Sequence, residues 1–171
     1  MAEEGDVLTD LNPSNGNGAD TSPVAGIITQ YVKDLSVENP KAPDSFGWNE
    51  APELDVQFNI AARPLNDEVQ EVTLKISTSA KMSQGTAYIV ELSYCGLVGM
   101  RNMPEEQKHA FIYAEAPRFL FPFARRVIAD ATRDAGFQPL VLDPIDFTAI
   151  YVQQLQQQQQ AGDAPAEGGE A

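Results

Sequence analysis

The stretch EVTLKISTSAKMSQGTAYIVELSYCGLV, residues 71–98, decides the fold of this chain. In its first half, every second residue is predicted to face the protein interior; these residues are Val72, Leu74, Ile76 and Thr78. Residues 86–98 alternate in the same way. Successive side chains of a β-strand point to opposite faces, so the pattern predicts two strands. Gln84 and Gly85 lie between them and mark a turn. Residues 71–98 are therefore predicted to form an antiparallel pair.

Two further segments, residues 27–38 and 54–60, also alternate and predict two more strands. In the first segment, one face is predicted to carry Tyr31, Leu35 and Val37, interrupted by Lys33, and the other Val32, Asp34, Ser36 and Glu38. Residues 39–52 hold three prolines and are predicted to form a crossing loop. Short links between the strands favour an antiparallel meander with one solvated face.

The hydrophobic period changes after the fourth strand. Pro104, followed by two glutamates, predicts a helix start. Pro117 and Pro122 are expected to break or bend this helix, after which a second amphipathic stretch runs toward a C-cap at Gly136. Asp143-Pro144 predicts the start of a last helix. The expected fold class is α+β: a four-stranded antiparallel sheet with C-terminal helices packed on one face.

The chain is strongly acidic, with 11 Lys and Arg against 25 Asp and Glu in 171 residues and a formal net charge of −14. Such a surface disfavours nucleic acid and anionic membranes as partners. Cys95 is the single cysteine, so neither a disulfide framework nor a cysteine-based metal site is expected within one chain. No signal peptide or membrane-spanning run is evident, and the cytoplasm is the expected location.

Part of this charge lies in two terminal segments of low hydrophobicity. Residues 1–23 contain five acids and no base, and residues 156–171 contain five glutamines followed by three acids. Both segments are predicted to be disordered tails, because they lack the apolar surface that would offset the entropy of ordering. Residues 24–155 are the predicted folded domain.

The sequence predicts a binding protein more readily than an enzyme. His109 is the single histidine and lies in a polar helical turn, while Cys95 has no identifiable base nearby. Asp34 and Glu38 share a strand face, as do Ile89 and Glu91. If the two strands contribute to one sheet surface, these residues form either an acidic docking surface with an apolar spot or an ordinary solvated face. The aromatic residues of the crossing loop either fill the core or line an open groove; these are Phe46 and Trp48.

Several segments, taken in order, resemble the SecB family of bacterial protein-export chaperones. They are YVKDLSVENP at residues 31–40, Ala42-Pro43 before the aromatic loop, LFPFAR at 120–125, GFQPL at 136–140 and LDPIDF at 142–147. Each is short, but their joint order over residues 27–155 is specific.

The resemblance implies a homotetramer, a dimer of dimers, that holds unfolded precursor proteins without ATP or another cofactor and delivers them to the SecA ATPase. It implies a SecA-binding surface made of Asp34, Glu38, Ile89 and Glu91. It also implies a client-binding groove that includes Phe46, Trp48 and Phe137. An alternative is a SecB-like chaperone dedicated to a single partner, such as a toxin–antitoxin system.

Overall fold

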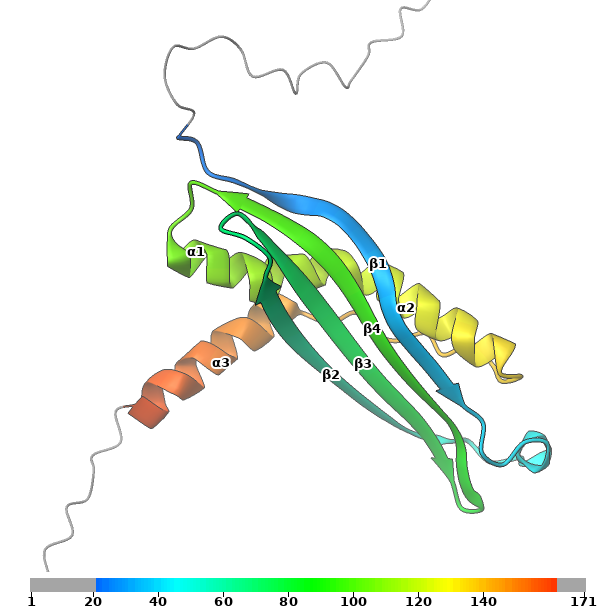
Figure 1. Ribbon diagram of the computed structural model, residues 1–171. Helices are drawn as coiled ribbons and strands as arrows, with labels where there is room; N and C mark the ends of the chain where they lie inside the picture. Colours follow the sequence, from blue (N-terminus) through cyan, green and yellow to red (C-terminus); the bar gives the residue numbers. More distant parts are fainter. Residues whose placement is uncertain (1–20, 163–171) are drawn as a thin grey trace, which may run out of the picture.

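A four-stranded antiparallel sheet forms the body of the computed structural model, which describes residues 21–162 (Figure 1). Its strands are β1 (Val24–Glu38), β2 (Glu53–Pro64), β3 (Val69–Met82) and β4 (Gly85–Arg101). All four predicted strands are present, each longer than its alternating core, and the α+β fold class is confirmed.

The order of the strands in the sheet is β1-β4-β3-β2, so the predicted meander is correct only for the last three strands. β1 pairs with β4 and not with its sequence neighbour β2. The crossing loop explains the difference: it includes a short 3-10 helix, η2 (Asp44–Gly47), and carries the chain from one edge of the sheet to the other (Figure 1). Both β1 and β2 are therefore edge strands.

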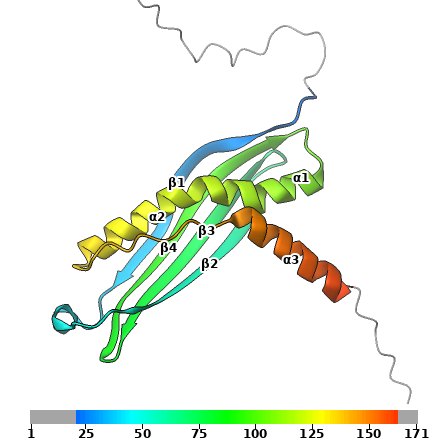
Figure 2. The ribbon, with the colours of Figure 1, turned by 180° about the vertical axis from the view of Figure 1, so that it is seen from behind.

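One continuous helical segment crosses the sheet, made of α1 (Glu105–Ala110), the π-helical turn η3 (Phe111–Glu115) and α2 (Ala116–Asp134) (Figure 2). The prolines were expected to break or bend the helix, and a break is wrong, because the helical residues continue through both Pro117 and Pro122. Pro117 lies in the first turn of α2, directly after η3, where its missing amide leaves no α-helical bond broken. Pro122 lies inside α2 and has no amide hydrogen to donate to the carbonyl of Arg118. Both residues are exposed, so water can bind that carbonyl instead.

The hydrophobic core lies between α2 and the sheet face that it covers, which we call the inner face. Buried side chains of β3 and β4, including Leu74, Ile76 and Leu92, meet Leu120 and Ile128 of α2. The opposite, outer face carries no helix of the described residues (Figures 1 and 2).

Gly96 of β4 allows α2 to approach the sheet closely. A Cβ atom at this position would lie 2.9 Å from Cδ2 of Leu120. Leu120 is itself fully buried, so the contact between β4 and α2 depends on a large side chain from the helix and on the absence of one from the strand.

The chain returns along α2 before the last helix, α3 (Phe147–Gly162). Thr132, buried within α2, accepts a hydrogen bond from the amide of Leu140 at 2.9 Å and so ties the returning segment to the helix. The predicted N-cap at Asp143 is wrong: Asp146 caps α3, accepting a bond from the amide of Ala149 at 2.9 Å. Asp143 and Pro144 belong instead to the extended approach.

The predicted C-terminal boundary also changes. α3 continues through residues 156–162, which were expected to be disordered, because glutamine has a good intrinsic helix propensity and the run contains no helix breaker before Gly162. The remaining residues of the two predicted tails, 1–20 and 163–171, lie outside the described residues, and residues 21–23 have no regular structure.

Leu120→Ala tests the packing of α2 on the sheet. The substitution removes a fully buried side chain that packs against Gly96 of β4. We expect the free energy of unfolding, measured by urea denaturation, to fall by about 2–5 kcal/mol. Val141→Ala is the matched control, since Val141 is 65% exposed, and its effect should stay within about 0.5 kcal/mol. Equal losses for the two variants would contradict the assigned core.

Candidate binding surfaces

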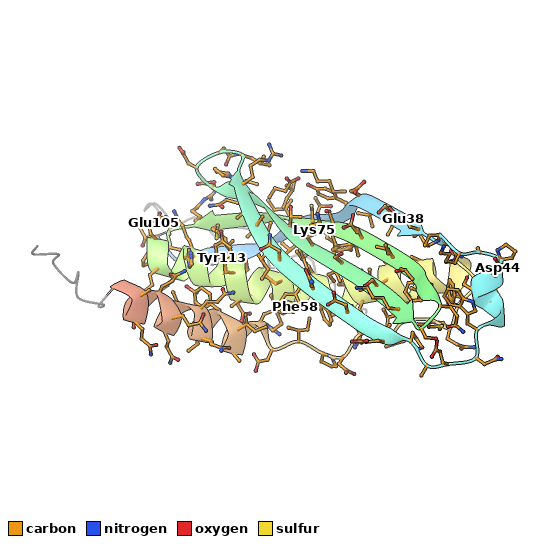
Figure 3. The ribbon with its side chains drawn as sticks, turned by 90° about the horizontal axis from the view of Figure 1, so that it is seen from below. Glu38, Asp44, Phe58, Lys75, Glu105 and Tyr113 are labelled. Carbon is orange, nitrogen blue, oxygen red and sulfur yellow. The ribbon has the colours of Figure 1, made fainter. Side chains whose placement is uncertain are left out.

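The four residues predicted to bind SecA lie together on the outer face. In the register of β1 and β4, Glu38 pairs with Ile89, Ser36 with Glu91, and Asp34 with Ser93. Paired residues of antiparallel strands share a face, so Glu38 and Glu91 lie beside the half-buried side chain of Ile89, and Asp34 lies farther along the same face. Glu38 lies near the end of the sheet that carries the crossing loop, and Lys75 lies farther along it (Figure 3). We call Asp34, Glu38, Ile89 and Glu91 the acidic face.

A β-bulge at Lys33 sets which residues of β1 reach this face. Val32 pairs with Tyr94 and Asp34 with Ser93, leaving Lys33 as the extra residue. The predicted faces of β1 are therefore partly wrong: Tyr31 shares the outer face with Asp34, and Val32 shares the inner face with Leu35.

Glu71 is a buried carboxylate next to the bulge, and it joins three strands. Although it lies on the outer face of β3, it is only 5% exposed. It accepts hydrogen bonds from the hydroxyl of Tyr31, from Nζ of Lys33 at 2.8 Å, and from Nη2 of Arg63 on β2 at 3.2 Å. The strand pattern places Glu71 on the polar side of β3 but gives no sign that it is covered.

The electrostatics of this cluster keep Glu71 ionised. Hydrogen bonds from Lys33 and Tyr31 outweigh its burial and lower the pKa of Glu71 from 4.5 to about 2. The hydrogen bond to Glu71 in turn raises the pKa of Tyr31 to about 12, so the phenol remains a donor at neutral pH.

An aromatic cluster joins the crossing loop to the end of α2. The ring of Phe137 lies 5.4 Å from that of Phe46 and 4.9 Å from that of Tyr88. Gly136 makes room for the ring of Phe46, because a Cβ atom at position 136 would lie 2.8 Å from Cε1 of that ring. The backbone angle φ of +96° at this position also suits glycine. Phe46 nevertheless remains 51% exposed.

The three predicted groove residues are therefore not equivalent. Phe46 and Phe137 are in contact, whereas Trp48 is partly buried and packs beside Gly85 in the turn between β3 and β4. Tyr88 completes the cluster with Phe137. The alternation of residues 86–98 puts Tyr88 on a strand face but does not reveal its partners, which come from a distant part of the chain.

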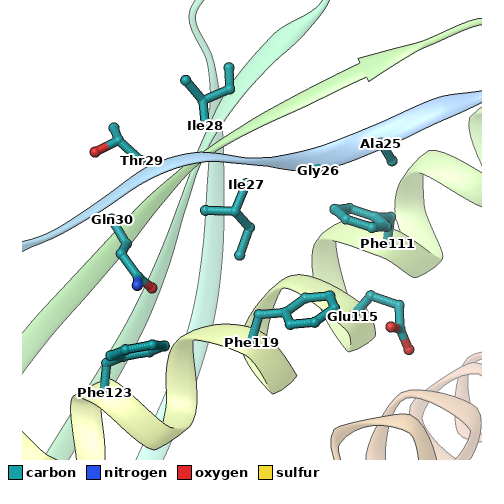
Figure 4. A pocket seen from close by; sticks show the side chains of 10 residues that line it. All are labelled: Ala25, Gly26, Ile27, Ile28, Thr29, Gln30, Phe111, Glu115, Phe119 and Phe123. Carbon is teal, nitrogen blue, oxygen red and sulfur yellow. The ribbon is translucent and has the colours of Figure 1, made fainter. Parts of the chain in front are cut away.

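Apolar side chains are also exposed along both edges of the inner face. They are Val32, Leu35 and Val37 on β1, and Leu54, Val56 and Phe58 on β2. A groove of about 580 Å³ lies between the first part of β1 and the helical segment, where Phe111, Phe119 and Phe123 face Ile27 (Figure 4). So much exposed apolar surface is typical of a protein that binds other chains.

The residues considered for enzyme chemistry do not form a common site. Cys95 is fully buried, its Sγ lies 3.2 Å from Oγ1 of Thr73, and burial raises the pKa of its thiol. His109 lies on α1, and its Nδ1 is 2.8 Å from the hydroxyl of Tyr151 on α3. Cys95 belongs to the outer side of the sheet and His109 to the helices on the inner side.

Within residues 21–162, no three or more His, Cys, Asp or Glu side chains are grouped to hold a metal ion. In the same part of the chain, no helix has the length and hydropathy needed to cross a membrane.

An acidic face on one side of the sheet and exposed apolar side chains on the other are typical of a protein that binds other chains through open surfaces. The model of the family described as preprotein translocase subunit SecB matches residues 18–158. The protein-export protein SecB of Erythrobacter litoralis is 63% identical, covering 99% of this chain and 97% of its own length. The protein-export protein SecB of Novosphingobium aromaticivorans is 58% identical, and the match covers 98% of this chain and 99% of that protein. The chain therefore belongs to the SecB family and is a protein-export chaperone.

A solved structure also shares the fold. It is a SecB-like chaperone of Mycobacterium tuberculosis in complex with a ChAD peptide from the HigA1 antitoxin, with a TM-score of 0.59 over 71% of this chain and 90% of that one. At 15% identity this likeness concerns the fold alone. The high identity to export proteins favours general export over the predicted alternative of a single dedicated partner.

Glu71→Gln tests the buried carboxylate. The pKa of Glu71 is lowered on folding, so its stabilising effect is complete above its usual pKa of 4.5 and is lost as pH falls toward 2. We expect the variant to lose about 1–3 kcal/mol of unfolding free energy at pH 7 and less at pH 3. Urea denaturation at both pH values measures this. Glu106→Gln, at an exposed site, is the control, and a pH dependence identical to that of the parent would contradict the assignment.

Proposed function

We propose that this chaperone is an ATP-independent holdase that binds unfolded precursors on apolar surfaces and transfers them to SecA at the acidic face. The observation that carries the proposal is that these surfaces are separate. Asp34, Glu38 and Glu91 lie on the outer face, whereas the exposed apolar residues of β1 and β2 belong to the inner face. A client and SecA therefore need not compete for the same residues.

Client binding is proposed at the aromatic cluster and at the exposed apolar side chains of β1 and β2 on the inner face. Phe46, which is half exposed, offers its ring to an unfolded chain, while Phe137 packs against that ring and is itself in contact with Tyr88. Burial of a client's apolar side chains contributes about 25 cal/mol per Å². Such contacts do not read sequence, which suits a protein that must hold many different precursors.

SecA docking is proposed at the acidic face. Three carboxylates along one face, with Ile89 at one end of the row, favour a basic partner that also makes an apolar contact, as expected for the basic tail of SecA. The carboxylates are exposed, so the attraction should weaken as ionic strength rises.

Assembly into a homotetramer, a dimer of dimers, is also part of the proposal, as is a cytoplasmic location. Two features of the protomer support assembly. The outer edge of β1 has no strand partner within the described residues, and the groove beside it exposes Phe119 and Phe123. Exposed edges and large apolar patches are normally covered by another chain. Several copies of a weak client site would then act together.

The acidic face is tested with Asp34→Asn combined with Glu38→Gln. We expect SecA affinity to fall by about tenfold at low salt, with less effect at high salt, because the lost interaction is electrostatic. Calorimetric titration at two salt concentrations measures this. Glu106→Gln combined with Asp143→Asn removes the same charge from exposed sites elsewhere and should bind normally. Normal SecA binding by the first double variant would exclude this docking site.

The client site is tested with Phe46→Ala. We expect weaker suppression of aggregation of an unfolded precursor, with unchanged SecA affinity, because the substitution removes an exposed ring that packs on Phe137, whereas the carboxylates lie on the outer face of the sheet. Trp48 is the only tryptophan, so its emission also reports binding of a tryptophan-free client. Val141→Ala, at another exposed apolar position, is the control. Full holdase activity in the Phe46 variant would exclude the cluster as a client site.

A further inference from the structure

We propose that Tyr31, Lys33 and Glu71 are positioning residues that hold the bulge of β1 and thereby turn Asp34 and Glu38 toward the acidic face. The inference rests on the proposed function, in which this face binds SecA. It concerns three residues that are not themselves among the docking residues.

The bulge decides the orientation of the two carboxylates. Val32 pairs with Tyr94 on the inner face, and the next pair is Asp34 with Ser93 on the outer face. Without the extra residue, strict alternation would place Asp34 on the same face as Val32, and Glu38 would follow it. Both carboxylates would then point toward the helices and away from Ile89 and Glu91.

Packing alone holds this register weakly in the protomer. The inner-face residues of β1 on either side of the bulge, Val32 and Leu35, are 44% and 42% exposed, so each stabilises the register less than a fully buried side chain would. β1 is also an edge strand, paired on one side only. A separate interaction is needed to fix the bulge.

Glu71 provides that interaction from β3, with β4 lying between it and β1. Lys33, the bulged residue itself, donates from Nζ to Oε1 at 2.8 Å, and the hydroxyl of Tyr31 donates to Oε2. The carboxylate is buried and ionised, so it needs these donors. Loss of Tyr31 removes the donor to Oε2, and loss of Lys33 leaves Oε1 with Arg63 from β2. The bulge is therefore anchored on both oxygens of one carboxylate.

For Lys33→Met, the loss of positive charge and the loss of the anchor predict opposite changes in SecA affinity. Removing a positive charge next to Asp34 makes the acidic face more negative, which by itself would strengthen binding of a basic partner. Loss of the anchor would instead weaken binding, because the carboxylates lose their orientation. Arg63→Met is the matched control: Arg63 contacts the same Oε1 at 3.2 Å and carries the same charge, but it lies on β2, away from the bulge.

The first measurement reports the register of β1 without SecA. In a Cys95→Ala background, Ser36→Cys and Glu91→Cys form a cross-strand pair that can be oxidised to a disulfide only when both side chains share a face. We expect Lys33→Met and Tyr31→Phe to slow this oxidation by about fivefold or more, and Lys33→Arg and Arg63→Met to leave it unchanged. Unchanged oxidation in both of the first two variants would overturn the inference.

The second measurement is SecA affinity in chains with the native acidic face. We expect Lys33→Met and Tyr31→Phe to weaken binding by about fivefold, with Lys33→Arg restoring it and Arg63→Met binding as the parent does. Tighter binding by Lys33→Met would overturn the inference. So would slowed oxidation with unchanged affinity, since orientation would then not matter for docking. Failure of the docking site itself is distinguished by the Asp34 and Glu38 double variant, which would then bind SecA normally.

Discussion

The packing of α2 against β3 and β4 is the interaction on which the rest of the molecule depends. Leu120 and Ile128 meet the inner-face residues of the two central strands, and Gly96 lets the helix come close. One helix is too narrow to cover four strands. The central pair is therefore buried while the edge strands keep apolar side chains in contact with solvent. The exposed apolar surfaces of the edge strands follow directly from this geometry.

The sheet also separates two kinds of recognition within a thin body. Its inner side offers apolar contact, which is insensitive to sequence and to salt, and its outer side offers carboxylates, whose attraction falls with ionic strength. Because alternate residues of one strand serve the two sides, Val37 and Glu38 are neighbours in the chain and yet belong to different surfaces. A change of register in β1 would thus exchange the surfaces rather than simply loosen one of them.

Local patterns were sufficient to predict the strands, the fold class and the two same-strand pairs, Asp34 with Glu38 and Ile89 with Glu91, but not the pairing of β1 with β4 that joins them on one face. They were not sufficient where a distant residue decides the outcome. The interruption at Lys33 is visible in the sequence, but its resolution as a bulge depends on Glu71, nearly forty positions away. Asp143 and Asp146 are both reasonable caps, and the packing of Phe147 into the core selects the second. The glutamine run shows the converse, since composition suggested disorder where helix propensity and continuity with α3 prevailed.

The close approach of Gly136 and Phe46 links two positions that are ninety residues apart. No side chain fits at position 136 while the Phe46 ring keeps its place, and a non-glycine residue there would in addition be strained by its backbone angle. The size of the ring at position 46 and the absence of a side chain at 136 therefore form a single trait. A variant of this chaperone with a different groove aromatic would have to be designed as a pair of substitutions, with the crossing loop and the end of α2 redesigned together.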